Sequence, residues 1–260
     1  MVSRVLSQFA MSFRHYLFPT LLGVGVMASW EFACRIFRIA DYIFPSPSII
    51  ATRVFFNFGY LFGHSATTFF EALCGLCLAF AVGFCLGALF AVLPSAEQMA
   101  LPYFVASQAV PIVAIAPLFI LWFGNGLQSK ILMAALMCFF PIVVGSSRGL
   151  KSVSEEQLDL FRVHAASKWQ VFTMLRLPAS IPHVLTGLRV SAALAMIGAI
   201  VAEYAGADKG IGYVIMQATY RLDTPLLFSA ISFSALGGLL MFGGVVAGER
   251  FLVRRYTYPD

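Results

Sequence analysis

Residues 72–96 read ALCGLCLAFAVGFCLGALFAVLPSA, and this run contains no charged side chain. A second uncharged run extends from Thr224 to Gly248. Both are longer than the roughly 20 residues that a helix needs to cross the hydrocarbon core of a bilayer. Backbone polar groups in lipid must be satisfied within their own segment, and the sequence lacks the period-two pattern of a membrane barrel. The two runs therefore predict transmembrane helices.

The composition of the whole chain agrees with a membrane protein. Of its 260 residues, 60% are hydrophobic and only 11% are charged, whereas a soluble domain has about 25% charged residues. The net charge of +5 could indicate a nucleic-acid partner. However, the basic residues lie in short segments beside the apolar runs, as the positive-inside rule expects, and not in a stripe interleaved with aromatic residues. We therefore expect contact with membrane lipid and no nucleic-acid partner.

The predicted fold class is an all-α polytopic membrane protein with about six transmembrane helices. One transmembrane domain covers residues 1–260, divided into an N-terminal span with an external interfacial helix (1–66), a core (67–250) and a basic tail (251–260). The first span is expected to stay uncleaved, because no small-residue cleavage pattern follows it. The six predicted spans are Tyr16–Ile36, Thr67–Leu93, Pro102–Phe123, Ser129–Ser147, Pro182–Ala205 and Pro225–Ala247.

The distribution of Lys and Arg sets the expected orientation. More basic residues fall on one side of the predicted membrane than on the other, which places both termini and the long insert after the fourth span in the cytoplasm. The basic residues on that side are Arg4, Arg14, Arg148, Lys151, Arg162, Lys168, Arg176, Arg250, Arg254 and Arg255. Two pairs of glycines at four-residue spacing, Gly83 with Gly87 and Gly244 with Gly248, favour close packing between helices.

The insert between the fourth and fifth spans, residues 155–189, is charged and amphipathic. Its apolar residues recur at spacings of 3, 4, 4 and 3, which predicts one stripe along a single helix. Pro178 and Pro182 are expected to break the chain before the fifth span begins. Two interpretations are open: a surface helix that lies on the membrane or on its own bundle, or an apolar ridge that fills a groove on another protein. The stripe consists of Leu158, Phe161, Ala165, Trp169 and Phe172.

Several residues within the predicted spans are candidates for a solute pathway. Pro111 and Pro117 interrupt the third span, either as simple kinks or because that span lines a passage. Glu203 either lines the external mouth of the pathway or holds the loop that follows it. Other residues favour structural roles: Trp122 as an aromatic anchor at the membrane interface rather than a substrate platform, Glu71 as an interfacial acid, and Arg189 as a cation that reaches the cytoplasmic interface.

The insert resembles the cytoplasmic loop of ABC importer permeases, in the branch of binding-protein-dependent permeases for nitrate, sulfonate, taurine and thiamine precursors. In that family the loop usually opens with Glu-Ala-Ala and has a glycine six residues after the glutamate. This chain has Asp159-Leu160-Phe161 and Ala165 at those positions, and Ala165 would be strained at positive φ. The resemblance extends from about Phe44 to Phe251 and rests on four stretches: 45–48 (PSPS), 121–130 (LWFGNGLQSK), 165–189 (AASKWQVFTMLRLPASIPHVLTGLR) and 202–213 (AEYAGADKGIGY).

The resemblance implies a translocation subunit rather than an enzyme. It implies a homodimer of permeases in a bacterial inner membrane, two cytoplasmic ATPase subunits that bind ATP and Mg²⁺, and an external solute-binding protein. No lysine of this chain follows a glycine, so the chain has no phosphate-binding loop and no cofactor of its own is expected. The coupling helix would present Leu158, Asp159, Phe161, Arg162, Ala165, Ala166, Ser167, Trp169 and Phe172 to the ATPase.

The cargo that the resemblance implies is a small organic or anionic solute. Residues 205–210 and 223–225 resemble the members for a pyrimidine precursor of thiamine or a riboflavin-like solute more than those for a sulfonate, taurine or nitrate, which implies a cargo of the first kind. The alternative is a self-contained secondary transporter or channel, which would need intramembrane ion-coupling residues and often a repeated half. The sequence offers few buried acids and no persuasive repeat. An intramembrane enzyme is disfavoured because neither a nucleophile motif nor a metal-ligand pattern is present.

Overall fold

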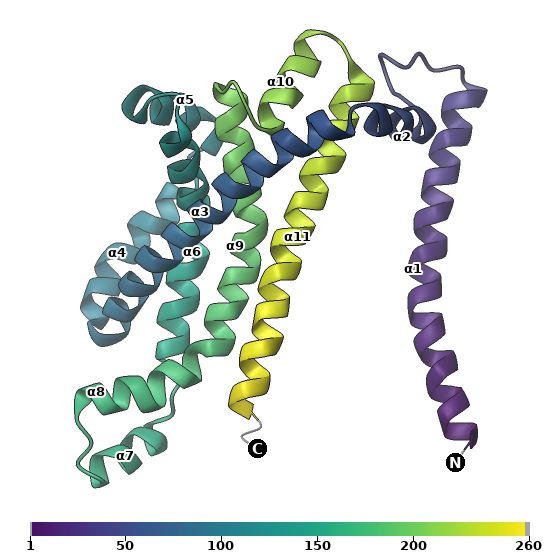
Figure 1. Ribbon diagram of the computed structural model, residues 1–260. Helices are drawn as coiled ribbons and strands as arrows, with labels where there is room; N and C mark the ends of the chain where they lie inside the picture. Colours follow the sequence, from purple (N-terminus) through teal and green to yellow (C-terminus); the bar gives the residue numbers. More distant parts are fainter. Residues whose placement is uncertain (1, 258–260) are drawn as a thin grey trace. The chain divides into compact units, whose positions relative to one another are not determined.

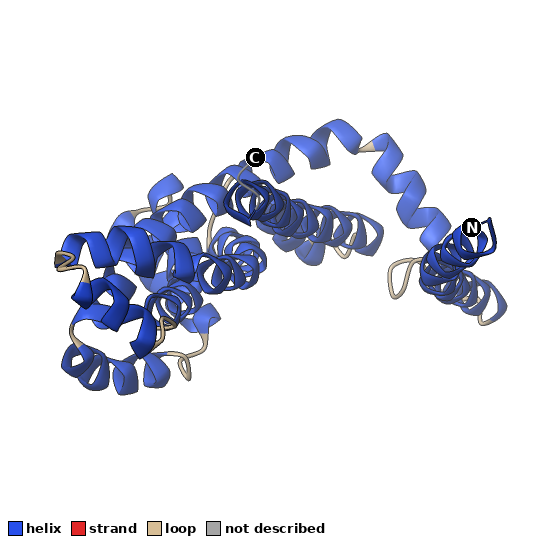
Figure 2. Ribbon diagram, turned by 90° about the horizontal axis from the view of Figure 1, so that it is seen from below, coloured by secondary structure: helices blue, strands red, loops and turns tan. Residues whose placement is uncertain are grey.

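A computed structural model describes the backbone of residues 2–257 and the side chains of residues 17–250. In this described part of the chain every regular element is a helix, as Figure 2 shows. Five helices are long and apolar enough to cross a membrane, and a sixth span results if α4 and α5 are counted together. The predicted all-α polytopic membrane fold is confirmed. The side chains of Arg4, Arg14, Arg254 and Arg255, which contribute to the predicted orientation, lie outside the described residues.

The helices divide between two compact units, residues 1–58 with 217–229 and residues 59–216 with 230–260. Figure 1 labels the helices along the chain. Their bounds are α1 Val2–Ile36, α2 Pro47–Phe56, α3 Phe58–Val92, α4 Pro94–Ser107, α5 Ile112–Phe123, α6 Leu127–Leu150, α7 Glu155–Val163, α8 Lys168–Gln170, the π-helix η1 Val171–Arg176, α9 Leu177–Ala205, α10 Ile211–Tyr220 and α11 Thr224–Thr257.

The first unit contains α1, α2 and the chain around the start of α11. The predicted external helix appears as α2, with Ser46 as its N-cap and Pro47 in its first turn. Glu31 of α1 accepts hydrogen bonds from the backbone N–H of Ser48 at 3.0 Å and from its hydroxyl at 2.8 Å. Arg53 of α2 forms an ion pair with Asp223. These polar contacts join the start and the middle of α2 to the rest of the unit.

The second unit has a core in which α6 packs along α9 and α3 packs on α6 (Figure 1). Small residues permit these close approaches. A Cβ atom added at Gly87 of α3 would lie 2.9 Å from the Val143 carbonyl oxygen of α6, and one added at Gly145 would lie 2.9 Å from the His183 carbonyl oxygen of α9. The first predicted glycine pair therefore does lie at a helix contact. Gly244 and Gly248 face open space in the described structure.

Two predicted spans differ from the structure. The third span is not one helix from Pro102 to Phe123, because α4 and α5 meet at an angle of 100° across the break before Pro111. The fifth span does not begin at Pro182. Its helix already starts at Leu177, since Pro178 lies in the first turn, where proline costs no hydrogen bond, and Pro182 is accommodated inside the helix.

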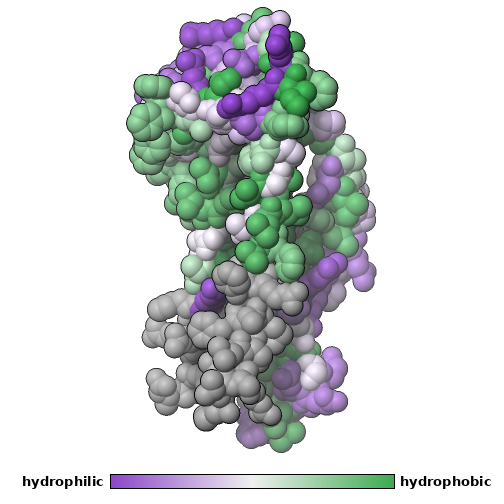
Figure 3. All heavy atoms as spheres, turned by 90° about the vertical axis from the view of Figure 1, so that its right-hand side faces the viewer, coloured by the Kyte–Doolittle hydropathy of each residue, from purple (hydrophilic) through white to green (hydrophobic). Residues whose placement is uncertain are grey.

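Apolar side chains cover the middle of the surface in Figure 3, and hydrophilic side chains gather at its upper end. Single leucine, valine and phenylalanine residues are exposed along the long helices, with Leu22 71% and Leu240 67% exposed. Such a surface would be unfavourable in water and is suited to lipid contact. The described surface therefore agrees with the membrane assignment made from composition.

Candidate functional site

The insert after α6 folds as two helical segments with a sharp turn between them, which we call the elbow (residues 155–176). The sequence predicts one continuous helix from Leu158 to Phe172, and this prediction is wrong. Helix α7 ends at Val163, and a new helical segment starts at Lys168 and continues through η1 into α9. The predicted stripe is consequently split between two helices, with Leu158 and Phe161 on the first and Trp169 and Phe172 on the second.

The backbone hydrogen bonds of the turn explain why the helix ends. The N–H of Ala165 donates to the Arg162 carbonyl at 2.9 Å, and the N–H of Ala166 donates to the Phe161 carbonyl at 3.0 Å. This pair of bonds is the Schellman motif, which requires a left-handed residue just after the helix. Ala165 occupies that position with φ of +50°. The strained conformation considered for Ala165 is therefore the one that the structure adopts.

Both segments of the elbow start with a capping box. The Ser154 hydroxyl accepts from the Gln157 N–H, and the Gln157 side chain accepts from the Ser154 N–H. Ser167 and Gln170 form the same reciprocal pair at the start of α8. A capping box satisfies N–H groups that a helix start leaves without intrahelical partners. Ser167 thus has a structural role in the turn in addition to its expected place at the coupling surface.

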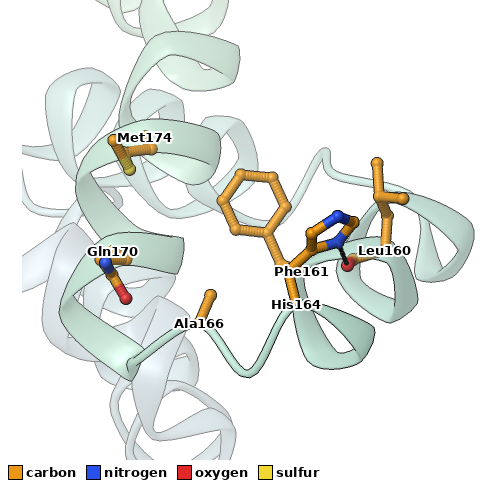
Figure 4. A pocket seen from close by; sticks show the side chains of 6 residues that line it. All are labelled: Leu160, Phe161, His164, Ala166, Gln170 and Met174. Carbon is orange, nitrogen blue, oxygen red and sulfur yellow. Dashed lines mark hydrogen bonds between the residues drawn. The ribbon is translucent and has the colours of Figure 1, made fainter.

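The inner angle of the elbow forms an apolar groove of about 330 Å³. Figure 4 shows the Phe161 ring in this groove, between the α7 side and the α8–η1 side. His164 lies at the end of α7, and its ring Nδ1 is 2.8 Å from the Leu160 carbonyl oxygen. The side chains that line the groove are Leu160, Phe161, His164, Ala166, Gln170 and Met174.

The other residues predicted for the coupling surface lie around this groove. Trp169 is 70% exposed and stacks on Phe172, with ring centroids 5.8 Å apart. Arg162 donates to Asp159 at 2.7 Å, and both side chains are about two-thirds exposed. Exposed ion pairs add little to stability. Both charged groups of this pair remain open to solvent at the surface. The elbow therefore presents a large exposed indole and an apolar groove, with a charged pair beside them.

Two polar contacts that the sequence did not reveal join the elbow and its approach to the bundle. Arg176 at the end of η1 donates to the Ala91 carbonyl at 3.2 Å, in the last turn of α3. Lys151, just after α6, forms an ion pair with Glu97 of α4, which also accepts from Ser147 at 2.8 Å. The partners lie 50 or more residues apart in sequence, so no local pattern indicates them. The elbow thus contacts the end of α3 through Arg176, and the chain that leads into it contacts α4.

The predicted pathway residues have different environments. Pro111 caps α5 at the break after α4, Pro117 lies inside α5, and both are exposed. Trp122 is 65% exposed near the end of α5. Glu203 is fully buried and accepts hydrogen bonds from Thr68 and from the Gly212 N–H, each at 2.7 Å. Of the two interpretations of Glu203, this geometry agrees with the one in which it holds the following loop.

One other charged residue differs from its predicted place, and a second has a partner that the sequence did not indicate. Glu71 is not an interfacial acid, because α3 starts at Phe58 and places Glu71 well inside the helix, where it is 4% exposed. Arg189 donates to Glu249 of α11 at 2.7 Å through its Nε. Its charge therefore has a partner within the protein.

Comparisons with known proteins decide the family. Residues 81–253 match the family of binding-protein-dependent transport system inner membrane components. The chain belongs to this family of ABC importer permeases. The permease is 36% identical to a probable ABC transporter permease of Haemophilus influenzae, over 83% of this chain and 88% of that one. It is also 36% identical to the formylaminopyrimidine transport permease of Halalkalibacterium halodurans (90% and 94% of the two chains) and to the riboflavin transport permease of Chloroflexus aurantiacus (88% and 86%).

Membership in this family, together with the apolar helices, establishes a multi-pass inner membrane protein of an ABC importer for small solutes. The resemblance inferred from the sequence is confirmed. The relatives are transport permease subunits, which agrees with a translocation role rather than an enzymatic one.

Proposed function

We propose that the elbow docks in a cleft of a separate ATPase subunit on the cytoplasmic side of the membrane. The observation that carries this proposal is the combination of the apolar groove with the exposed Trp169 on a segment between two membrane spans. A segment that only connected α6 to α9 would need a short polar turn. Tryptophan is one of the residues most often found to contribute strongly to binding at protein interfaces.

The split elbow refines the mechanism that a single rigid helix would imply. In the proposed complex, two permease copies form the pathway and two ATPase subunits bind beneath them. ATP and Mg²⁺ bind to the ATPase, and ATP favours one of two bundle states because the ATPase pair binds that state more tightly. The elbow transmits this preference through its continuous connection to α9 and through Arg176 to the end of α3. A solute-binding protein delivers cargo on the opposite side.

The docking is tested with Phe161→Asp and Trp169→Asp, each co-expressed with the cognate ATPase. Either aspartate would place an unpaired charge in the apolar contact, so we expect loss of ATPase co-purification and loss of ATP-dependent uptake. Gln128→Asp is the matched control, because Gln128 is exposed at the opposite end of α6 and should retain both activities. If both elbow variants keep full association and uptake, the docking proposal is wrong.

A self-contained transporter is distinguished by reconstitution. We expect liposomes that contain the permease without the ATPase to show no uptake under an ion gradient. Uptake under those conditions would support the alternative of a secondary carrier or channel. Addition of the ATPase, ATP, Mg²⁺ and the binding protein should produce uptake.

We further propose that the cargo is a small planar heteroaromatic solute. Two of the relatives described above are named for formylaminopyrimidine and riboflavin, which share a pyrimidine-type ring. Selectivity in such systems depends largely on the solute-binding protein. The decisive measurement is the identity of the ligand that co-purifies with the cognate binding protein. A sulfonate, taurine or nitrate in its place would refute the heteroaromatic assignment.

A further inference from the structure

A buried polar node lies where α3, α9 and the start of α10 meet in the second unit. Three successive backbone N–H groups, at the end of the α9–α10 connection and the start of α10, donate to side chains in this node. Gly210 donates to His64 Nδ1 at 3.0 Å, Ile211 to the Thr68 hydroxyl at 2.8 Å, and Gly212 to Glu203 Oε2 at 2.7 Å. The first N–H groups of a helix have no intrahelical acceptors, so these side chains both cap α10 and hold the connection onto α3 and α9.

Glycine at two positions makes this close approach possible. Gly210 has φ of +101°, and a Cβ atom there would collide with the Glu203 carboxyl group. A Cβ atom at Gly212 would lie 2.8 Å from the Cβ of Glu203 and would also collide with the Ile200 carbonyl oxygen. The node is therefore built around the carboxyl group of Glu203.

Glu71 adds a second carboxyl group to the node. Its side chain lies within hydrogen-bonding range of the Glu203 carboxyl group. Both residues are buried, at 4% and 0% exposure. Glu71 Oε2 has no hydrogen-bond partner and is shielded from solvent. Two ionised carboxylates are both acceptors and cannot bond to each other, whereas one protonated carboxyl donates to the other. A buried unpaired carboxylate oxygen is costly, so the geometry requires a hydrogen atom at this contact.

The surrounding charges do not supply the missing donor. Lys130 of α6 is the buried base near the pair, but its ammonium donates to the backbone oxygen and to Oδ1 of Asn125, each at 2.7 Å. Asp208 and Lys209 of the connection are exposed to solvent. Lys130 offsets one negative charge, and the second carboxyl remains to be neutralised. Among the described residues no group of three His, Cys, Asp or Glu side chains could hold a metal ion.

We propose that Glu71 and Glu203 hold one proton between them and that this shared proton fastens the α9–α10 connection to α3. The proton lies on the Glu71 carboxyl group, because Glu203 already accepts two hydrogen bonds, and Glu71 donates it to the Glu203 carboxylate. The remaining negative charge accepts the hydrogen bonds of Thr68 and of the Gly212 N–H. This proton site is separate from the elbow and does not depend on the proposed ATPase docking or on the identity of the cargo.

The proton is detected by infrared spectroscopy of the full-length permease in nanodiscs at neutral pH. We expect a carbonyl-stretch band of a protonated carboxyl group that shifts on deuteration. The band should be lost in Glu71→Gln, because the amide supplies the donor and leaves Glu203 ionised. Glu156→Gln, which alters an exposed glutamate on α7, should leave the band unchanged. The absence of such a band in the wild-type permease, or its persistence in both Glu71→Gln and Glu203→Gln, would overturn the proposal.

A second measurement separates a shared proton from a merely space-filling pair. Glu71→Gln should retain the wild-type melting temperature and the protection of the Gly210, Ile211 and Gly212 amides from hydrogen exchange, because its amide donates as the protonated carboxyl does. Glu71→Ala should lose that protection. If Glu71→Gln lowers both quantities as much as Glu71→Ala, the pair does not require a donor and the proposal fails.

Discussion

The elbow and the polar node place their residues in opposite ways. The elbow leaves apolar side chains exposed, with Trp169 at 70%, and forms few bonds to the bundle. The node buries Glu71 and Glu203 inside the protein and surrounds them with donors from several segments. Each arrangement places a residue type in the environment where it is seldom found. Exposed apolar groups indicate contacts completed by another molecule, whereas buried charged groups indicate contacts completed within the fold.

The comparison also indicates where each region tolerates change. The node depends on backbone space and on bonds that have no solvent substitute, so substitutions there should act on folding. The elbow depends on a surface whose partner is a separate protein, so substitutions there should act on association and uptake while the permease remains folded.

Gly212→Ala should destabilise the permease most. The added methyl group would overlap the Ile200 carbonyl oxygen and press on Glu203, and neither belongs to a flexible chain end. Overpacking of this kind costs about 3 kcal/mol, which would appear as a lower melting temperature of the purified protein. Gly238→Ala is the matched control, because a Cβ atom at Gly238 of α11 meets nothing within 4 Å. Equal melting temperatures for both variants would show that the residues of the node can shift to accommodate the added methyl group.

Arg176→Ala should have an intermediate effect. The Arg176 guanidinium donates to the Ala91 carbonyl in the last turn of α3, where helix carbonyls lack intrahelical donors and favour a cation. Loss of a charged donor costs about 2 kcal/mol. We expect the variant to bind the ATPase but to show reduced uptake for each ATP hydrolysed. Arg35→Ala, which removes an exposed arginine and its ion pair with Glu31 within α1, should leave this coupling ratio closer to wild type. A lower ratio for Arg35→Ala than for Arg176→Ala would contradict the proposed route to α3.

The sequence was enough to locate most of the membrane spans, because a span is visible in the sequence as a long run of residues without charge. It was insufficient where the chain bends. The break before Pro111 and the end of α7 at Val163 lie within patterns that are compatible with continuous helices. At Ala165 the side chain itself gives no signal of positive φ. Only the glycine that the family usually has there indicated the turn.

The polar node could be predicted only in part. Glu203 was recognised because a charge inside a span is costly, and holding the following loop was one of its two predicted roles. His64, Thr68 and Glu71 lie at helical spacing on one face of α3, and this was the available signal for their cooperation. Their partners come from residues 203–212, which are far away in the sequence. Spacing within one helix cannot identify such a contact.

Ala165→Gly should have the smallest effect and should be stabilising. Ala165 adopts φ of +50° at the turn that ends α7, and a left-handed conformation costs a residue with a Cβ atom about 1 kcal/mol relative to glycine. The substitution should therefore slow hydrogen exchange of the backbone amides of residues 165 and 166, which form the Schellman bonds. Ala166→Gly is the matched control with the opposite sign, since Ala166 is not at positive φ and glycine there only adds freedom to the unfolded chain. Faster exchange in Ala165→Gly would mean that the elbow is not held bent in the free permease. The turn would then form only on contact with the ATPase, and the elbow would differ from the node in its order as well as in its exposure.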